Sequence, residues 1–180
     1  MSTSMLIVII VVAVIVVAAI AALVSMQARR RHLQSRFGPE YERAVEEQGG
    51  RMAAERDLRA REERHDKLDI KELPAERRQQ YAQEWSGVQE HFVDRPEGSL
   101  SEADELVSRL MRERGYPTEG YSGAVRDLSV EHGRTLEHYR AAHGVKERSG
   151  NGQATTEELR GAMVHYRALF EELLTDQRSR

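Results

Sequence analysis

The chain has 180 residues and no cysteine, and 32% of its residues are charged, with a formal net charge of −3. Without cysteine it can form no disulfide, thiolate nucleophile or Cys-ligated zinc or iron–sulfur site. The first 28 residues carry no charge, whereas residues 37–180 hold 23 basic and 30 acidic side chains, a net charge of −7. This acidic, interleaved pattern argues against nucleic acid as a partner, because proteins that bind phosphate backbones present a basic face.

An unbroken apolar run from Met5 to Val24 is the first element. At about 1.5 Å per residue, twenty helical residues reach about 30 Å, the thickness of the hydrocarbon core of a bilayer. We therefore expect residues 1–28 to form a transmembrane anchor with the lipid bilayer as its partner. A cleaved signal peptide is the alternative, but its apolar region is typically only about 7 to 15 residues long and follows basic residues, which are missing here.

Positive charge follows the apolar run and does not precede it. Because Lys and Arg close to a span are retained in the cytoplasm, we expect a single-pass protein of the cell membrane with its short N-terminus outside. The same basic side chains are candidates for binding anionic lipid headgroups, at on the order of 1 kcal/mol each. A stop-transfer flank is the simpler interpretation. The basic juxtamembrane segment 29–38 contains Arg29, Arg30, Arg31 and Arg36.

The remainder of the chain has apolar residues at helical spacing, and no stretch alternates with a period of two. We therefore expect an all-α fold in which a helical soluble domain, residues 39–143, follows the anchor. Gly38 and Pro39 are expected to end any helix that leaves the membrane, with Pro39 in the first turn of the next helix. Residues 51–67 predict a further helix, so charged that we interpret it as a solvated strut.

Four helices, the first opening at Pro74, are expected to build the core of this domain. The second has Ser101 and Asp104 as an approximate capping arrangement and ends at Gly115, a residue suited to a left-handed cap. We expect the apolar stripe of the first helix to be buried, because large apolar residues at this spacing face a core. The stripe consists of Tyr81, Trp85, Val88 and Phe92. The two shorter helices are expected over residues 121–128 and 134–143.

The C-terminal part of the chain predicts a linker and a last helix. Residues 144–154 are rich in Gly, Ser, Asn and charge, which is typical of a flexible linker. Thr155 and Glu158 then form a capping box at the start of an amphipathic helix in the segment 155–180. We favour packing of this helix onto its own domain, because an exposed apolar stripe lowers solubility, and a free partner-binding helix is the alternative. The stripe consists of Leu159, Met163, Tyr166, Phe170 and Leu173.

Four short segments carry a resemblance to known proteins: residues 36–41 (RFGPEY), 85–94 (WSGVQEHFVD), 114–117 (RGYP) and 139–143 (YRAAH). Together they resemble a family of uncharacterised bacterial proteins, single-pass, membrane-anchored and helical, whose members are usually labelled only as membrane or secreted proteins. The resemblance covers roughly residues 33–143. It supports the domain boundary and implies no activity, substrate or cofactor.

No motif in the sequence indicates catalysis, a cofactor or a bound metal. Glu62-x-x-His65 is half of a carboxylate-bridged di-iron motif, but the chain has no second Glu-x-x-His. His138 and His143 lie five residues apart, about 140° around a helix, so they cannot share a metal without another segment. We therefore expect no catalytic, cofactor-binding or metal-ligating residues.

Two classes of function remain open at this point. The helical, charged pattern favours a membrane-tethered interaction or scaffold module that is not an enzyme and that binds an unidentified protein partner. The alternative is a membrane-bound enzyme whose site is assembled from distant side chains near the aromatic helix. A third possibility is an extracytoplasmic or secreted helical domain left after signal cleavage. The candidates for the enzyme site are Glu84, His91, His132 and His138.

Overall fold

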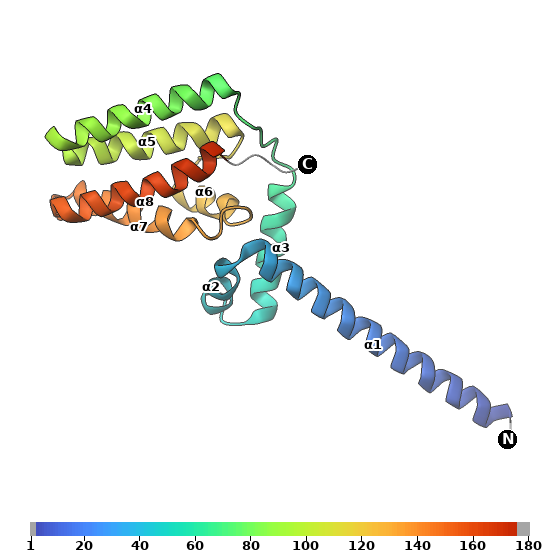
Figure 1. Ribbon diagram of the computed structural model, residues 1–180. Coiled ribbons are helices and arrows are strands. Elements are labelled where there is room, and N and C mark those ends of the chain that lie inside the picture. Colours follow the sequence, from blue (N-terminus) through green and yellow to red (C-terminus); the bar gives the residue numbers. More distant parts are fainter. Residues whose placement is uncertain (1–2, 176–180) are drawn as a thin grey trace. The chain divides into compact units, whose positions relative to one another are not determined.

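The computed structural model describes residues 3–175, which form eight α-helices and no strand (Figure 1). The all-α prediction is therefore confirmed. The chain divides into two compact units, Met1–Leu58 and Arg59–Arg180, and α3 (Arg51–His65) contributes residues to both. The helical domain expected over residues 39–143 crosses this division.

The first unit is built on α1 (Thr3–Phe37), which continues from the apolar run through the arginines to its last residue. Among the described residues it is the one helix that is long and apolar enough to cross a membrane, and none of its apolar window is buried. As predicted, α1 ends just before Gly38, whose φ is +54°, and Pro39 lies in the first turn of α2 (Pro39–Glu47). The juxtamembrane segment is thus helical up to Phe37.

A small core forms where the C-terminal end of α1 meets α2 and the start of α3. The hydroxyl of Tyr41 on α2 donates to Glu55 Oε1 on α3 at 2.9 Å. Since α3 buries residues on this core, the interpretation of 51–67 as a solvated strut is wrong. The helix has a narrow apolar face on which Ala54 and Leu58 are buried, whereas Met52 is exposed. The buried apolar residues are Leu33, Phe37, Tyr41, Ala44, Ala54 and Leu58.

In the second unit, α4 (Ala75–Asp94) and α5 (Pro96–Arg114) form one helical hairpin, and α7 (Leu136–Ser149) and α8 (Thr156–Thr175) form another (Figure 1). The short α6 (Tyr121–Leu128) connects the two hairpins. Helix α5 packs against α4, α7 and α8 and is the most deeply buried of the set. It lies at the centre of the bundle because its apolar positions are fully covered, namely Leu100, Ala103, Leu106, Val107, Leu110 and Met111.

The two predicted apolar stripes of the bundle face its core. On α4, Tyr81, Trp85 and Val88 are buried and Phe92 is half-buried. The Trp85 ring stacks on Phe170 of α8, with 4.7 Å between ring centroids. Because the α8 stripe is buried against α5 and α7, the last helix packs onto its own unit, and the alternative of a free partner-binding helix is wrong.

Helix α5 begins earlier than expected. It starts at Pro96, whose fixed φ suits a first helical turn, and no side chain caps its N-terminus. The predicted capping role of Ser101 and Asp104 is therefore wrong. Asp104 instead accepts hydrogen bonds from Lys146 and from the Tyr166 hydroxyl, so its place is decided by contacts with α7 and α8.

Helix α7 extends into the segment expected to be a linker. It runs to Ser149, which is buried, so only residues after it remain as a loop before α8. A glycine inside a helix costs about 1 kcal/mol relative to alanine, which is why the sequence around Gly144 suggested a linker. Packing of Val145 on the core and the contact of Lys146 with Asp104 offset that cost.

Two predicted helix ends are confirmed. The capping box of α8 forms: the Glu158 N–H donates to Thr155 Oγ1 at 3.3 Å, and the Thr155 N–H donates to Glu158 Oε2 at 2.8 Å. Gly115 ends α5 in the left-handed conformation, with φ +96°. A Cβ at this position would lie 2.3 Å from the backbone oxygen of Asp69, so the close approach of the two segments also requires glycine.

Candidate functional site

Two buried histidines and two partly exposed carboxylates lie around Tyr116, the residue that follows the Gly115 cap. The Tyr116 hydroxyl lies 3.1 Å from Glu131 Oε2 and 3.0 Å from His132 Nε2. His132 Nδ1 lies 2.6 Å from Glu172 Oε1 on α8. Both the tyrosine and the histidine are only 2% exposed. We refer to Tyr116, Glu131, His132, Glu172 and the adjacent His65 as the Tyr116 cluster.

The hydrogen bonds of the Tyr116 cluster restrict where its protons lie. A tyrosine hydroxyl carries one proton, and a carboxylate only accepts. When Tyr116 donates to Glu131, His132 donates from both ring nitrogens, to Tyr116 and to Glu172, and is positively charged. When Tyr116 donates to His132, the imidazole is neutral. The Tyr116 hydroxyl proton therefore has two acceptors within reach, Glu131 and His132.

His65, from the last turn of α3, completes the cluster. It is 2% exposed, its ring centroid lies 6.2 Å from that of Tyr116, and its Nε2 lies 3.6 Å from Glu131 Oε2. Neither ring nitrogen makes a hydrogen bond in the described part of the chain. The Glu62-x-x-His65 half-motif thus places its histidine against a carboxylate and an aromatic ring.

Two further side chains hold the end of α3 to the α6 region. Nε and Nη2 of Arg64 both donate to Asp127 Oδ1, at 2.9 and 2.6 Å. Arg61 lies 3.4 Å from the Ser129 hydroxyl. Because the Asp127 side chain is only 4% exposed, its charge depends on this guanidinium for compensation. These contacts and His65 attach the last two turns of α3 to the segment that carries the Tyr116 cluster.

A fully buried arginine, Arg114, lies directly before the Gly115 cap. Its Nε donates to the Lys71 carbonyl at 3.2 Å, and its Nη1 donates to the Leu173 carbonyl at 2.8 Å, near the end of α8. The Lys71 N–H donates back to the Arg114 carbonyl at 2.8 Å. The Arg114 guanidinium also lies 6.0 Å from the centroid of the Tyr116 ring. Arg114 thus joins three segments of the unit and supplies positive charge beside the cluster.

A second buried polar group centres on Asp104. The Tyr166 hydroxyl donates to Asp104 Oδ1 at 2.8 Å, and Lys146 donates to the other carboxylate oxygen. Burial and the nearby Asp104 carboxylate raise the pKa of Tyr166, and the same two causes raise that of Tyr139. Both tyrosines therefore stay neutral near pH 7. The arrangement joins α5 to α7 and α8.

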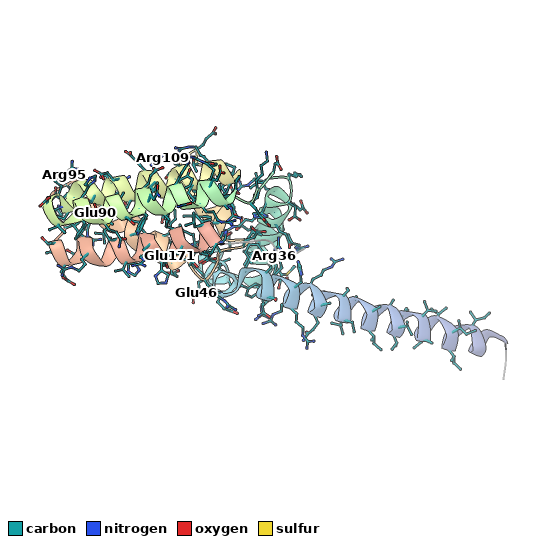
Figure 2. The ribbon with its side chains drawn as sticks, turned by 45° about the horizontal axis from the view of Figure 1, so that its top comes forward. Arg36, Glu46, Glu90, Arg95, Arg109 and Glu171 are labelled. Carbon is teal, nitrogen blue, oxygen red and sulfur yellow. The ribbon has the colours of Figure 1, made fainter. Side chains whose placement is uncertain are left out.

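The side chains expected for an enzyme take separate partners. Glu84 accepts from Arg109, and His91 Nδ1 lies 2.9 Å from Glu102 Oε2, both on the surface of the α4–α5 hairpin (Figure 2 labels Arg109). His132 belongs to the Tyr116 cluster, and His138 contacts His165. Their contacts do not converge on one site. Within residues 3–175, no group of three His, Cys, Asp or Glu side chains is arranged to hold a metal.

The two histidines of α7, His138 and His143, contact different partners. His143 stacks on Tyr121, with 3.9 Å between centroids and 6° between ring planes. His138 instead faces α8, where its Nδ1 lies 2.8 Å from Nδ1 of His165. As expected, the two side chains of α7 do not meet. What the sequence did not reveal is that α8 supplies a second histidine to one of them.

The predicted membrane flank lies in the last turns of α1. Arg29, Arg31 and Arg36 are exposed and Arg30 is half-buried (Figure 2 labels Arg36). Their places on one continuous helix follow directly from the sequence. Of the Tyr116 cluster, the sequence singled out only His65 and His132, each for another reason, because the members come from four separate segments and no spacing relates them. The one local signal was Gly115, whose tight approach to Asp69 marks the backbone on which the cluster is built.

Comparison of the chain with protein-family models, with curated proteins and with solved structures finds no match in any of the three. The resemblance of residues 33–143 to uncharacterised bacterial membrane-anchored proteins therefore stays a prediction.

Proposed function

We propose that the protein is a non-catalytic interaction or scaffold module that α1 tethers to the cell membrane, with a short N-terminus outside and the rest of the chain in the cytoplasm. The observation that carries the proposal is the exposed apolar surface of α1. Thirteen large apolar side chains of this helix are 49 to 66% exposed. Removing such a side chain from water stabilises by about 1.5 to 3 kcal/mol, so transfer of the helix into lipid is favourable by on the order of 20 kcal/mol.

The orientation rests on the distribution of positive charge. No basic residue precedes the apolar run, whereas Arg29, Arg30, Arg31 and Arg36 follow it. Basic residues this close to a span are retained in the cytoplasm. The same four side chains lie where a bilayer presents its headgroups, and we include anionic lipid headgroups among the proposed partners.

A non-catalytic role is supported by how the titratable groups are used. His132, the most buried of the enzyme candidates, is engaged by Tyr116 and Glu172, and Asp104 is engaged by Lys146 and Tyr166. In each case the contacts join helices, which is a structural role. The surface that remains to bind a partner is the outside of the bundle.

Cysteine labelling tests the topology, because the chain has no cysteine of its own. We would introduce Ser4→Cys and, separately, Gln153→Cys, in the exposed loop before α8. A membrane-impermeant maleimide added to intact cells is expected to modify the first variant at once and the second only after permeabilisation. Labelling of Gln153→Cys from outside would contradict the orientation. An intact mass shortened by the anchor would support signal cleavage instead.

Site-specific photocrosslinking in native membranes tests the interaction role. Val93 on α4 and Val164 on α8 are large apolar side chains that remain 84% and 62% exposed. A crosslinking residue at one of these positions is expected to capture a defined partner, while the buried Val107 serves as the matched control. If the exposed positions Val93 and Val164 yield no more crosslinked product than the buried Val107, a role in binding proteins is contradicted.

A further inference from the structure

The contact between His138 and His165 pairs two imidazoles across the α7–α8 hairpin. Their Nδ1 atoms lie 2.8 Å apart, and the rings are stacked with 5.0 Å between centroids and 29° between planes. One nitrogen donates and the other accepts, so at least one of the two rings presents a lone pair. Because both nitrogens point at the same small volume, an ion placed there would meet two ligands from one protein.

The pair is accessible and lies among small side chains. His138 is exposed and His165 is half-buried. One helical turn away on the same faces lie Ala141, Gly161 and Ala168, none of which is buried. A Cβ added to Gly161 would meet nothing within 4 Å, so there is open space beside His165. Water or a ligand from another molecule has room to approach.

We propose that His138 and His165 form a binding site for a borderline transition-metal dication such as Cu²⁺ or Zn²⁺, with Nδ1 of each ring as a ligand. For metal–nitrogen bonds of about 2.0 to 2.1 Å at a tetrahedral angle, the two nitrogens need to be about 3.3 Å apart. The observed separation has to widen by roughly half an ångström, which small rotations of two surface side chains supply. The remaining coordination positions stay open.

The protonation chemistry of the pair is compatible with this use. A histidine binds metal as the neutral ring. In a pair of neutral rings, one Nδ1 carries a proton and the other presents a lone pair, as the contact between the two nitrogens requires. On metal binding, the proton shared between the two Nδ1 atoms moves to an Nε2 position, which leaves both Nδ1 lone pairs for the metal.

The composition of the site predicts its selectivity. Imidazole nitrogens suit Cu²⁺, Ni²⁺ and Zn²⁺, and hard ions such as Mg²⁺ require oxygen ligands, of which the pair has none. For a fixed set of nitrogen ligands, Cu²⁺ binds more tightly than Ni²⁺ or Zn²⁺. With two protein ligands and no third acidic or histidine neighbour among the described residues, the site is open and exchangeable, unlike a closed structural zinc site.

Calorimetric titration of the full-length protein in detergent, purified without a polyhistidine tag, tests the proposal with CuCl₂ and ZnCl₂ as probes and MgCl₂ as the hard-ion control. The variants are His138→Ala, His165→Ala and the double variant. Each single variant is expected to bind Cu²⁺ about a hundredfold more weakly, because the second ligand of a chelate acts at high effective concentration. The double variant is expected to lose little more, because either change destroys the chelate.

His91→Ala is the matched control, since it removes an exposed histidine that already has a carboxylate partner, Glu102. It is expected to keep the affinity of the unsubstituted chain. Circular dichroism at each point confirms that the variants are folded. Unchanged Cu²⁺ affinity in both single variants, or an equal loss in His91→Ala, would overturn the proposal. Tight binding of Mg²⁺ at the same site would do so as well.

Discussion

The Tyr116 cluster and the His138–His165 pair each hold a histidine in a hydrogen bond to a side chain from a distant segment, yet the two sites differ in burial. In the first, His132 is 2% exposed and both its ring nitrogens have partners. In the second, His138 is exposed and His165 is half-buried, and the hydrogen bond described for the two rings is the one between them. A buried histidine whose partners come from other helices holds those helices together. An exposed pair can exchange its partner at little cost to the fold.

His132 and His91 allow a closer comparison, because each histidine contacts a glutamate through Nδ1. His132 Nδ1 lies 2.6 Å from Glu172, and His91 Nδ1 lies 2.9 Å from Glu102. Both are contacts between an imidazole and a carboxylate, but only the first histidine is buried. Loss of a buried polar group leaves its partner unsatisfied, whereas at the surface water replaces it. Substitutions at the two sites should therefore have very different effects on the free energy of unfolding.

The largest effect on the free energy of unfolding is expected from Gly115→Ala, which changes the backbone position directly before Tyr116. A Cβ there lies 2.3 Å from the Asp69 oxygen, and φ is +96°, so the segments have to move apart. We expect a loss of about 3 kcal/mol or more in the free energy of unfolding. Chemical denaturation measures it. Gly123→Ala in α6 is the control, because its Cβ would meet nothing, and a similar loss there would contradict the steric explanation.

Next in size is His132→Ala, which removes the centre of the cluster. It removes one hydrogen-bond partner from Tyr116 and one from Glu172 and opens a cavity, so we expect a loss of about 2 to 4 kcal/mol. His91→Ala, with the same type of partner on the surface, is expected to change the free energy of unfolding by less than about 0.5 kcal/mol. Equal losses in the two variants would remove the proposed distinction between the buried and exposed sites.

Tyr116→Phe is expected to have a smaller effect, because it keeps the ring and removes only the hydroxyl. His132 Nε2 and Glu131 both lose a hydrogen-bond partner, at a cost of about 1 to 2 kcal/mol. The double variant with His132→Ala should lose less than the sum of the two single changes, since both disrupt one network. Strict additivity in denaturation experiments would mean that the two residues act independently.

The smallest effect is expected in the pH dependence of the free energy of unfolding, through His165 of the His138–His165 pair. The pKa of His165 is lowered in the folded state, so between the unfolded value near 6.5 and the lower folded value the unfolded chain binds more protons. The contribution of His165 to stability therefore falls as the pH drops from about 7 through this window. We expect the stability of the unsubstituted chain relative to His165→Gln to decrease between pH 7.5 and pH 5. A constant difference across this range would contradict the lowered pKa.

Local chemistry decided which features the sequence could predict. Gly38 with Pro39, the left-handed Gly115 and the capping box of Thr155 and Glu158 each act within one helical turn, and the structure confirms all three. The expectations that failed involve distant partners. Asp104 was assigned to a cap because Lys146 and Tyr166, its actual partners, lie about 40 and 60 residues away in the sequence. Gly144 was assigned to a linker because the packing that keeps it helical comes from another helix.

By itself, the sequence determined the membrane-length apolar helix, the basic flank and the all-helical class, because apolar length, charge order and helical period are properties of contiguous residues. Only the tertiary structure decided which polar groups are buried and which histidines meet. Tyr116, His132 and Glu172 come from separate segments, as do His138 and His165. Their chemistry depends on distances of about 3 Å between side chains on different helices, and such distances are set by how the helices pack.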